Sequence, residues 1–254
     1  MDSNALQRVE GHAEAESSNG GQDMVPGKVT AKWWLLPIML VVPAAIVFLL
    51  MDQWYPFFYT NEGADDLGYL PPQLQQRLDR KNVVVLMSLL GGVLGISLSW
   101  VECLLQKSCR VRLAWLPVVA VSSVVAGAFG GLAGHELHVA LARSHSMSEL
   151  MKAVLTNLAL LGPMLAGIGA ILTFVVSADK RTSLVGLLSG ALAGVLIASV
   201  YPVAVALLFP RALTTALIPL ESAERVLWLA LCFLGAPIII VLAMHSRQPS
   251  VRPR

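Results

Sequence analysis

Two histidines and a glutamate, His135, Glu136 and His138, are the residues best suited to chemistry, and they follow a long run of small and apolar residues. Positions three apart lie on one face of a helix, so both imidazoles could approach one ion. The residue order does not match the HExxH motif of zinc peptidases, whose histidines are four apart and whose glutamate acts as base. We therefore interpret the cluster as a candidate proton or cation site without a metal or cofactor. The alternative is a group of interfacial histidines that only contact water.

His138 is expected to be the better buried of the two histidines. A helix would align it with Gly127, Gly131 and Gly134, which precede it by eleven, seven and four residues. A stripe of glycines gains nothing from facing lipid, so this face should contact protein. His135 continues only the row through Gly131 and should lie nearer the edge of the stripe.

Glu102 is a further candidate, because it is the carboxylate of an otherwise apolar segment, 82–105. If it is buried, it would be a cation or proton site, since an ionisable group inside a membrane is costly and usually functional. If it lies at the membrane boundary, Lys107 or Arg110 would neutralise it in an ion pair of little energetic value. Its depth decides between the two.

Glycines at intervals of four residues predict close helix packing, because they let two backbones approach each other. The glycines expected at helix contacts are Gly91, Gly95, Gly127, Gly131, Gly134, Gly186, Gly190 and Gly194. The alternative is that the missing side chains leave space along the helix face for a substrate path.

Ser189, which precedes Gly190, and His245 resemble the serine and histidine of rhomboid proteases, a family that also has six spans. The resemblance is limited to these two residues, because Leu187 occupies the place of the first glycine in the family's GxSG motif. The histidine and asparagine features of the family's second span are also absent. An intramembrane hydrolase is therefore not expected, and we predict no enzymatic activity.

The composition places the chain in a membrane. Of its 254 residues 56% are hydrophobic and 13% are charged, and the mean hydropathy is +0.69, whereas about a quarter of the residues of a soluble domain are charged. The net charge of +2, without a basic run interleaved with aromatics, excludes nucleic acid as a partner. Three cysteines without a CxxC pair predict three reduced thiols that pack in the interior.

Apolar runs separated by polar connections predict an all-α integral membrane protein, a bundle of six transmembrane helices. Each run is long enough to cross a hydrocarbon core of about 30 Å at about 1.5 Å per residue. The expected spans are 33–51, 82–105, 113–134, 153–178, 183–209 and 226–244. Residues 1–30 should form a disordered cytoplasmic tail, residues 52–81 an extracytoplasmic loop, and residues 245–254 a second cytoplasmic tail.

The orientation follows from the distribution of basic residues. The short connections at 106–112 and 179–182 contain Lys107, Arg110, Arg112, Lys180 and Arg181. Short cytoplasmic loops are enriched in Lys and Arg, so these connections and both termini are predicted to be cytoplasmic. The membrane would be the plasma membrane or the inner membrane of a cell.

Prolines inside three expected spans, Pro163, Pro202 and Pro237, are typical of the broken helices that surround the substrate in secondary transporters. Together with the glycine faces they favour a small-solute or ion permease, or the membrane subunit of one. The alternative is a non-catalytic anchoring or assembly protein that acts through its tail and its loop. In either case the lipid bilayer is a partner, and a membrane protein or a second copy of the chain is the further partner to look for.

Overall fold

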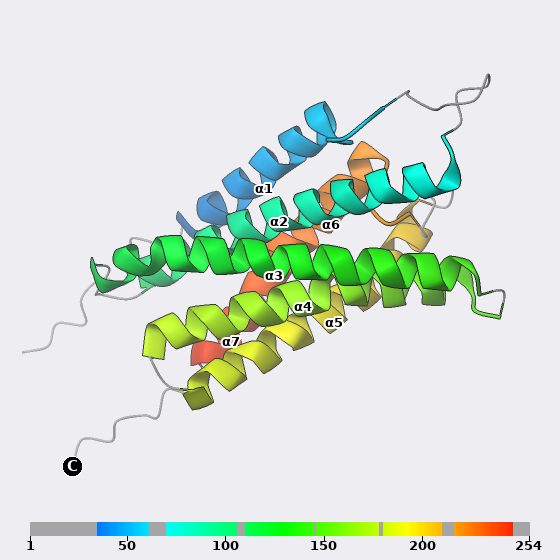
Figure 1. Ribbon diagram of the computed structural model, residues 1–254. Coiled ribbons are helices and arrows are strands. Elements are labelled where there is room, and N and C mark those ends of the chain that lie inside the picture. Colours follow the sequence, from blue (N-terminus) through cyan, green and yellow to red (C-terminus); the bar gives the residue numbers. More distant parts are fainter. Residues whose placement is uncertain are drawn as a thin grey trace, which may run out of the picture. The chain divides into compact units, whose positions relative to one another are not determined.

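The computed structural model describes residues 35–60, 70–105, 110–144, 146–177, 180–209 and 216–245. Within these ranges the chain is helical apart from short connections and contains no strand, which confirms an all-helical fold. The predicted tail 1–30 and residues 246–254 lie outside them. The helices in chain order are α1 (Leu35–Trp54), α2 (Pro72–Leu105), α3 (Arg110–Ala142), α4 (Glu149–Ser177), α5 (Lys180–Leu208), α6 (Ser222–Ala230), η3 (Leu231–Gly235) and α7 (Ala236–His245), shown in Figure 1.

In the part of the chain that the structure describes, five helices are long and apolar enough to cross a membrane. They cover Pro72–Cys103, Ala114–Ala142, Glu149–Val175, Arg181–Leu208 and Ser222–Ile240. The first expected span corresponds to a shorter apolar helix, Ile38–Trp54, so the structure supports five spans plus this helix and does not establish a sixth. The chain is a multi-pass membrane protein.

The second and third spans extend further into the polar regions than the apolar runs indicate. Helix α2 begins at Pro72, where a proline suits the first helical turn. Residues 73–90 contain neither glycine nor proline, so nothing interrupts the helix between its polar and its apolar part. Helix α3 likewise continues through the histidine cluster to Ala142. Both helices therefore project polar turns beyond the apolar bundle.

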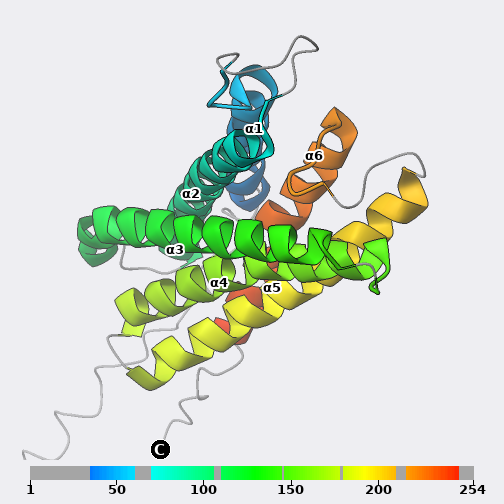
Figure 2. The ribbon, with the colours of Figure 1, turned by 45° about the vertical axis from the view of Figure 1, so that its right-hand side comes forward.

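The helices pack mainly against their neighbours in the chain. Each helix from α2 to α5 contacts the next, α7 contacts α5, and α1 contacts α2 and α6; Figure 2 shows this arrangement from a second side. The core consists chiefly of large side chains from α2 and α4. Among them Leu90, Leu94, Leu98, Leu160, Leu161, Met164 and Leu165 are fully buried. Helix α3 contributes Val119 to this core, and several of its contacts with α2 and α4 are made at glycines, namely Gly127, Gly130, Gly131 and Gly134.

The last helix runs from α6 to α7 through a π-helical turn, η3. In this turn the amide of Ala236 donates to the carbonyl of Leu231, five residues earlier. The ring of Pro237 has no N–H and would crowd the carbonyl of Phe233 in a regular α-helix. A wider turn relieves this conflict, so Pro237 changes the local winding without ending the helix.

The prediction of three reduced cysteines is wrong. Cys103 is disulfide-bonded, and Cys232 is a free thiol that is fully buried. An odd cysteine count without CxxC spacing does not exclude a bridge together with a lone thiol. Of the two cysteines that the structure describes, Cys232 is the interior packing residue of the kind expected.

Candidate functional site

A polar cavity of about 510 Å³ lies beside the first turns of α2 and the last turns of α3. Tyr55, which follows α1, and residues 216–220, which precede α6, complete its wall. Its polar side chains are Tyr55, Gln75, Gln76, Asp79, His135, His138 and Arg143, and the remaining lining is Pro72, Val83, Val139, Ala142, Ala216, Leu217, Ile218 and Leu220. The cavity thus gathers polar groups from three segments at one end of an apolar bundle, and residues 216–220 close it with apolar side chains.

Asp79 joins the two histidines in this cavity. It lies near the start of α2, and antiparallel packing of α2 against α3 brings it beside the end of α3. Its carboxyl group interacts electrostatically with both His135 and His138. A carboxylate facing two imidazoles can bind a cation or exchange a proton with them.

The expected order of burial of the two histidines is wrong. His135 is 3% exposed, whereas His138 is only partly buried. His138 does continue the helical stripe of Gly127, Gly131 and Gly134, but near the end of α3 this stripe faces the polar cavity and not a neighbouring helix. His135 is covered instead, on the side of α3 that carries Gly131 toward α2.

The buried ring of His135 has an unsatisfied nitrogen. Its Nδ1 has no hydrogen-bond partner among the described residues, and the nearest carboxylate oxygen, Oε1 of Glu136, lies 3.8 Å away. A buried polar atom without a partner costs roughly 1 to 3 kcal/mol. His135 lines the cavity, but its Nδ1 is covered by protein atoms, so a water molecule or a small polar ligand could reach it only after a local shift of the wall.

Glu136 takes no part in this cavity. Its side chain is 57% exposed and lies 3.5 Å from Nε of Arg80, whose side chain is 52% exposed. An ion pair at this exposure contributes little to stability. Of the three residues in the predicted cluster, the structure brings the two histidines together and turns the glutamate toward α2.

Tyr55 supplies a phenol at the cavity wall. Burial, and secondarily the charge of Asp79, raises the pKa of Tyr55 to about 12, against an opposing contribution from Arg225. The hydroxyl is therefore a neutral hydrogen-bond donor at any physiological pH. Asn82 holds the following segment against α2, because it accepts from the amide of Phe58 at 2.7 Å and donates to its carbonyl at 3.1 Å.

Glu102 does not belong to this site. It is 2% exposed and lies in α2, as Asp79 does. Their separation of 23 positions in the sequence corresponds to about 35 Å at 1.5 Å per residue of helix. The four predicted polar residues therefore separate into a histidine pair in the cavity, a surface glutamate, and a buried glutamate at the opposite end of the bundle.

All eight glycines singled out in the sequence lie where helices touch. In α3, a Cβ at Gly127 would overlap the carbonyl of Met87, and one at Gly131 would come within 2.9 Å of Cα of Val84. A Cβ at Gly134 would meet the side chain of Leu160 in α4. The others face backbone or small side chains: Gly91 and Gly95 face Ser123, Gly186 faces Gly169, Gly190 faces Leu165, and Gly194 faces Gly162.

Ser189 and His245 are the two residues that resemble the serine and histidine of rhomboid proteases, and the structure describes the side chain of Ser189 alone. The hydroxyl of Ser189 donates within its own helix, to the carbonyls of Val185 at 2.8 Å and Gly186 at 3.1 Å. The side chain of His245 lies outside the described residues. Ser189 is thus bonded as a helix-interior serine commonly is.

The sequence analysis missed several cavity residues, Asp79 above all. The prolines at 71 and 72 do predict a short polar helix through Arg80, but this helix was assigned to the extracytoplasmic loop 52–81 and was not joined to the second span. A usable signal was present. Pro72, Gln75, Gln76, Asp79 and Val83 follow the spacing of one helix face, and that face is polar until Val83.

Among the described residues, no group of three or more His, Cys, Asp and Glu side chains is arranged to hold a metal ion. No protein-family model matches the chain, and no match was found among curated proteins or solved structures.

Proposed function

We propose that the protein is a small-solute or ion permease, or the membrane subunit of one, and that the polar cavity receives the transported species. The cavity itself is the observation that carries this proposal. Its volume of about 510 Å³ suits a small molecule or a hydrated ion. Asp79, His135 and His138 supply charge and proton-exchange capacity beside a bundle that otherwise contains few ionisable groups, and such groups are usually functional.

The cavity does not continue through the bundle. Toward the opposite end the interior is filled by fully buried side chains such as Leu90, Leu94 and Leu165. On this proposal the structure is a state open only at the cavity end, and transport requires a change in helix packing. The π-helical turn before Pro237 is the place in the last helix best suited to such a change, because discontinuous helices serve this role in transporters.

The alternative function is non-catalytic anchoring or assembly. The closed apolar core favours it, because a bundle that never opens has no use for a continuous path. Outward-facing leucines on α5, including Leu184, Leu188 and Leu192, are exposed in the single chain and would contact lipid, a membrane protein or a second copy.

Transport assays in proteoliposomes separate the two functions. The purified protein would be tested for uptake of monovalent and divalent cations and for dissipation of an imposed proton gradient. If it is a permease, Asp79→Asn should reduce flux at least about tenfold, because Asp79 is the only carboxylate among the described residues that line the cavity. The control is Glu149→Gln, whose side chain is 65% exposed and lies outside the cavity. No flux above empty liposomes for any tested ion, or equal flux in both variants, would favour the anchoring function.

We also propose cytoplasmic termini in a plasma or inner membrane, on the basis of the basic connections at 106–112 and 179–182. The disulfide at Cys103 favours the reverse orientation, because cytoplasmic termini would place Cys103 on the cytoplasmic side, where thiols are normally reduced. An impermeant maleimide applied to intact cells should label Asp65→Cys and not Lys180→Cys. Permeabilised cells, in which both are labelled, provide the control, and the reversed pattern would invert the orientation.

A further inference from the structure

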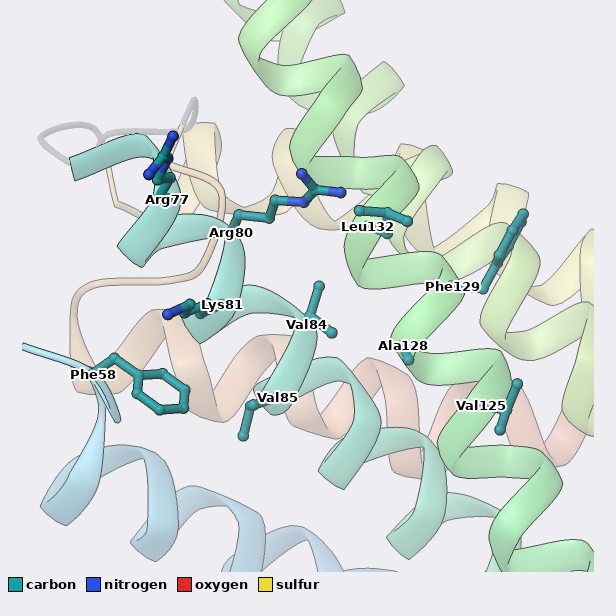
Figure 3. A pocket seen from close by; sticks show the side chains of 10 residues that line it. All are labelled: Phe58, Arg77, Arg80, Lys81, Val84, Val85, Val125, Ala128, Phe129 and Leu132. Atoms are coloured by element: carbon teal, nitrogen blue, oxygen red, sulfur yellow. The ribbon is translucent and has the colours of Figure 1, made fainter. Parts of the chain in front are cut away.

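A second cavity, separate from the polar one, lies in the groove between α2 and α3. It has a volume of about 980 Å³ and is lined by Phe58, Arg77, Arg80, Lys81, Val84, Val85, Val125, Ala128, Phe129 and Leu132. Three of these ten side chains are cationic and the other seven are apolar. Figure 3 shows the cations together at one end and the valines, Ala128 and Phe129 extending away from them.

The change from cationic to apolar lining takes place within one helical turn. Arg80 and Lys81 lie four residues before Val84 and Val85, a distance of about 6 Å along α2. The same step occurs where a bilayer passes from its headgroup region to its hydrocarbon. The apolar part is open to the membrane, since Val125 is 61% and Phe129 is 64% exposed.

The cations of the groove are only partly neutralised by the protein. Arg80 reaches across to α3 and lies 3.5 Å from Glu136. Lys81 lies over the ring of Phe58, with its Nζ 5.9 Å from the ring centroid. Arg77 makes no ion pair with the part of the chain that the structure describes. Among the residues that the structure describes, one carboxylate against three cations leaves a net positive charge of two at this end of the groove.

From this arrangement we propose that the groove binds an anionic phospholipid. Its phosphate contacts Arg77 and Lys81, with Arg80 beside them, and one acyl chain lies along Val85, Val125 and Phe129. Arginine and lysine together suit a phosphate group, and a basic side chain at the surface of an anionic membrane contributes about 1 kcal/mol. The acyl chain distinguishes this occupant from a free anion, because the larger part of the lining is apolar.

The close contact of α2 with α3 gives the groove its shape. Gly127 and Gly131 bring α3 against the backbone of α2 at Met87 and Val84. Ala128, which follows Gly127 and lines the groove, leaves space above this contact. The proposed lipid therefore lies over a seam between two helices that touch at the backbone, and it does not need the helices to separate.

Lipid selectivity in reconstituted protein tests the proposal. Spin-labelled phosphatidylglycerol and phosphatidylcholine would be compared in vesicles by the fraction of label that the protein immobilises. Vesicles carry the lipid in both leaflets, so the result does not depend on orientation. The wild-type protein should prefer the anionic lipid. Arg77→Gln with Lys81→Gln should lower the association constant of the anionic lipid roughly fivefold for each cation removed.

Two matched controls make the test specific. Lys152→Gln with Arg181→Gln removes the same charge from α4 and α5, outside the groove, and should preserve the preference. Ala128→Phe fills the groove without changing charge and should also abolish the preference, whereas Val121→Phe, on exposed surface outside the groove, should not.

Three results would overturn the proposal. One is an equal loss of preference in the two double variants, which would indicate a general effect of surface charge. Another is an equal affinity of the wild-type protein for the two lipids. The third is displacement of the anionic lipid by millimolar inorganic phosphate, which would identify a site for a free anion. Folding of each variant is checked by thermal unfolding in detergent, and the Arg80 and Glu136 pair is left intact in all of them.

Discussion

The contact between α4 and α5 differs in kind from the contact between α1 and the last helix. At the first, backbones touch: Gly186 faces the backbone of Gly169, and Gly190 faces the carbonyl of Leu165. At the second, large side chains such as Phe48 and Phe233 fill the space incompletely and leave an apolar cavity of about 280 Å³. A backbone contact has no rotamers to adjust, whereas side chains beside a void can repack.

This difference divides the bundle into a rigid part and an adaptable part. Helices α2 to α5 are joined in succession by glycine contacts. Helix α1 and the last helix are held by side chains, and the last helix also contains the π-helical turn. If the protein changes shape during function, we expect the change to occur in α1 and the last helix.

The largest effect is expected from Gly190→Leu. A Cβ at this position would overlap the carbonyl oxygen of Leu165, and α4 cannot move away without losing its other contacts with α5. We expect the free energy of unfolding to fall by about 3 kcal/mol or more, as in other overpacked interiors. Thermal unfolding in detergent measures it.

Gly235→Ala is the control for this substitution, because the nearest atoms to its Cβ are side-chain carbons of Ile197 at 3.9 Å. It should change stability by less than about 1 kcal/mol. If Gly190→Leu unfolds at the wild-type temperature, the distinction between rigid and adaptable contacts fails.

A smaller effect is expected from Pro237→Ala in the adaptable part. The alanine restores an amide donor and removes the clash with the carbonyl of Phe233, so the π-helical turn should relax toward a regular α-helix. Amide hydrogen exchange across residues 231–236 should slow severalfold. Pro202→Ala in α5 has no π-helical turn beside it and serves as comparison. Unchanged exchange would mean that Pro237 is not the cause of the wide turn.

The smallest effect is a stabilisation by Ala44→Leu. Ala44 lines the apolar cavity between α1 and the last helix, so added methyl groups would occupy empty space. Filling a cavity commonly stabilises a protein by about 0.5 to 2 kcal/mol. Ala126→Leu in α3 should instead destabilise the protein. Ala126 packs so closely against Gly167 that even a Cβ added at Gly167 would lie 2.7 Å from Cβ of Ala126. Destabilisation by both substitutions would show that the cavity collapses in the membrane.

Sequence alone predicted the helical membrane fold and most of the spans, because hydropathy reports directly on burial in lipid. It also identified the glycines that lie at helix contacts, because glycines four residues apart form a small-residue face that suits close packing whichever helix lies opposite. It could not predict that Asp79 would join His135 and His138, because that meeting depends on where α2 starts and how α3 passes it. The order of burial of the histidines depends on the same crossing, and helical spacing within α3 does not contain it.

The two hydrogen bonds between Asn82 and Phe58 make the Phe58 amide a reporter of motion at the polar cavity. They attach the segment after α1 to the rigid part, one turn of α2 away from Asp79 and beside Tyr55 at the cavity wall. Any swing of α1 that widens the cavity must first release the Phe58 amide to water. The exchange rate of this single amide therefore counts the openings of the cavity, and a solute that holds the cavity shut would slow it.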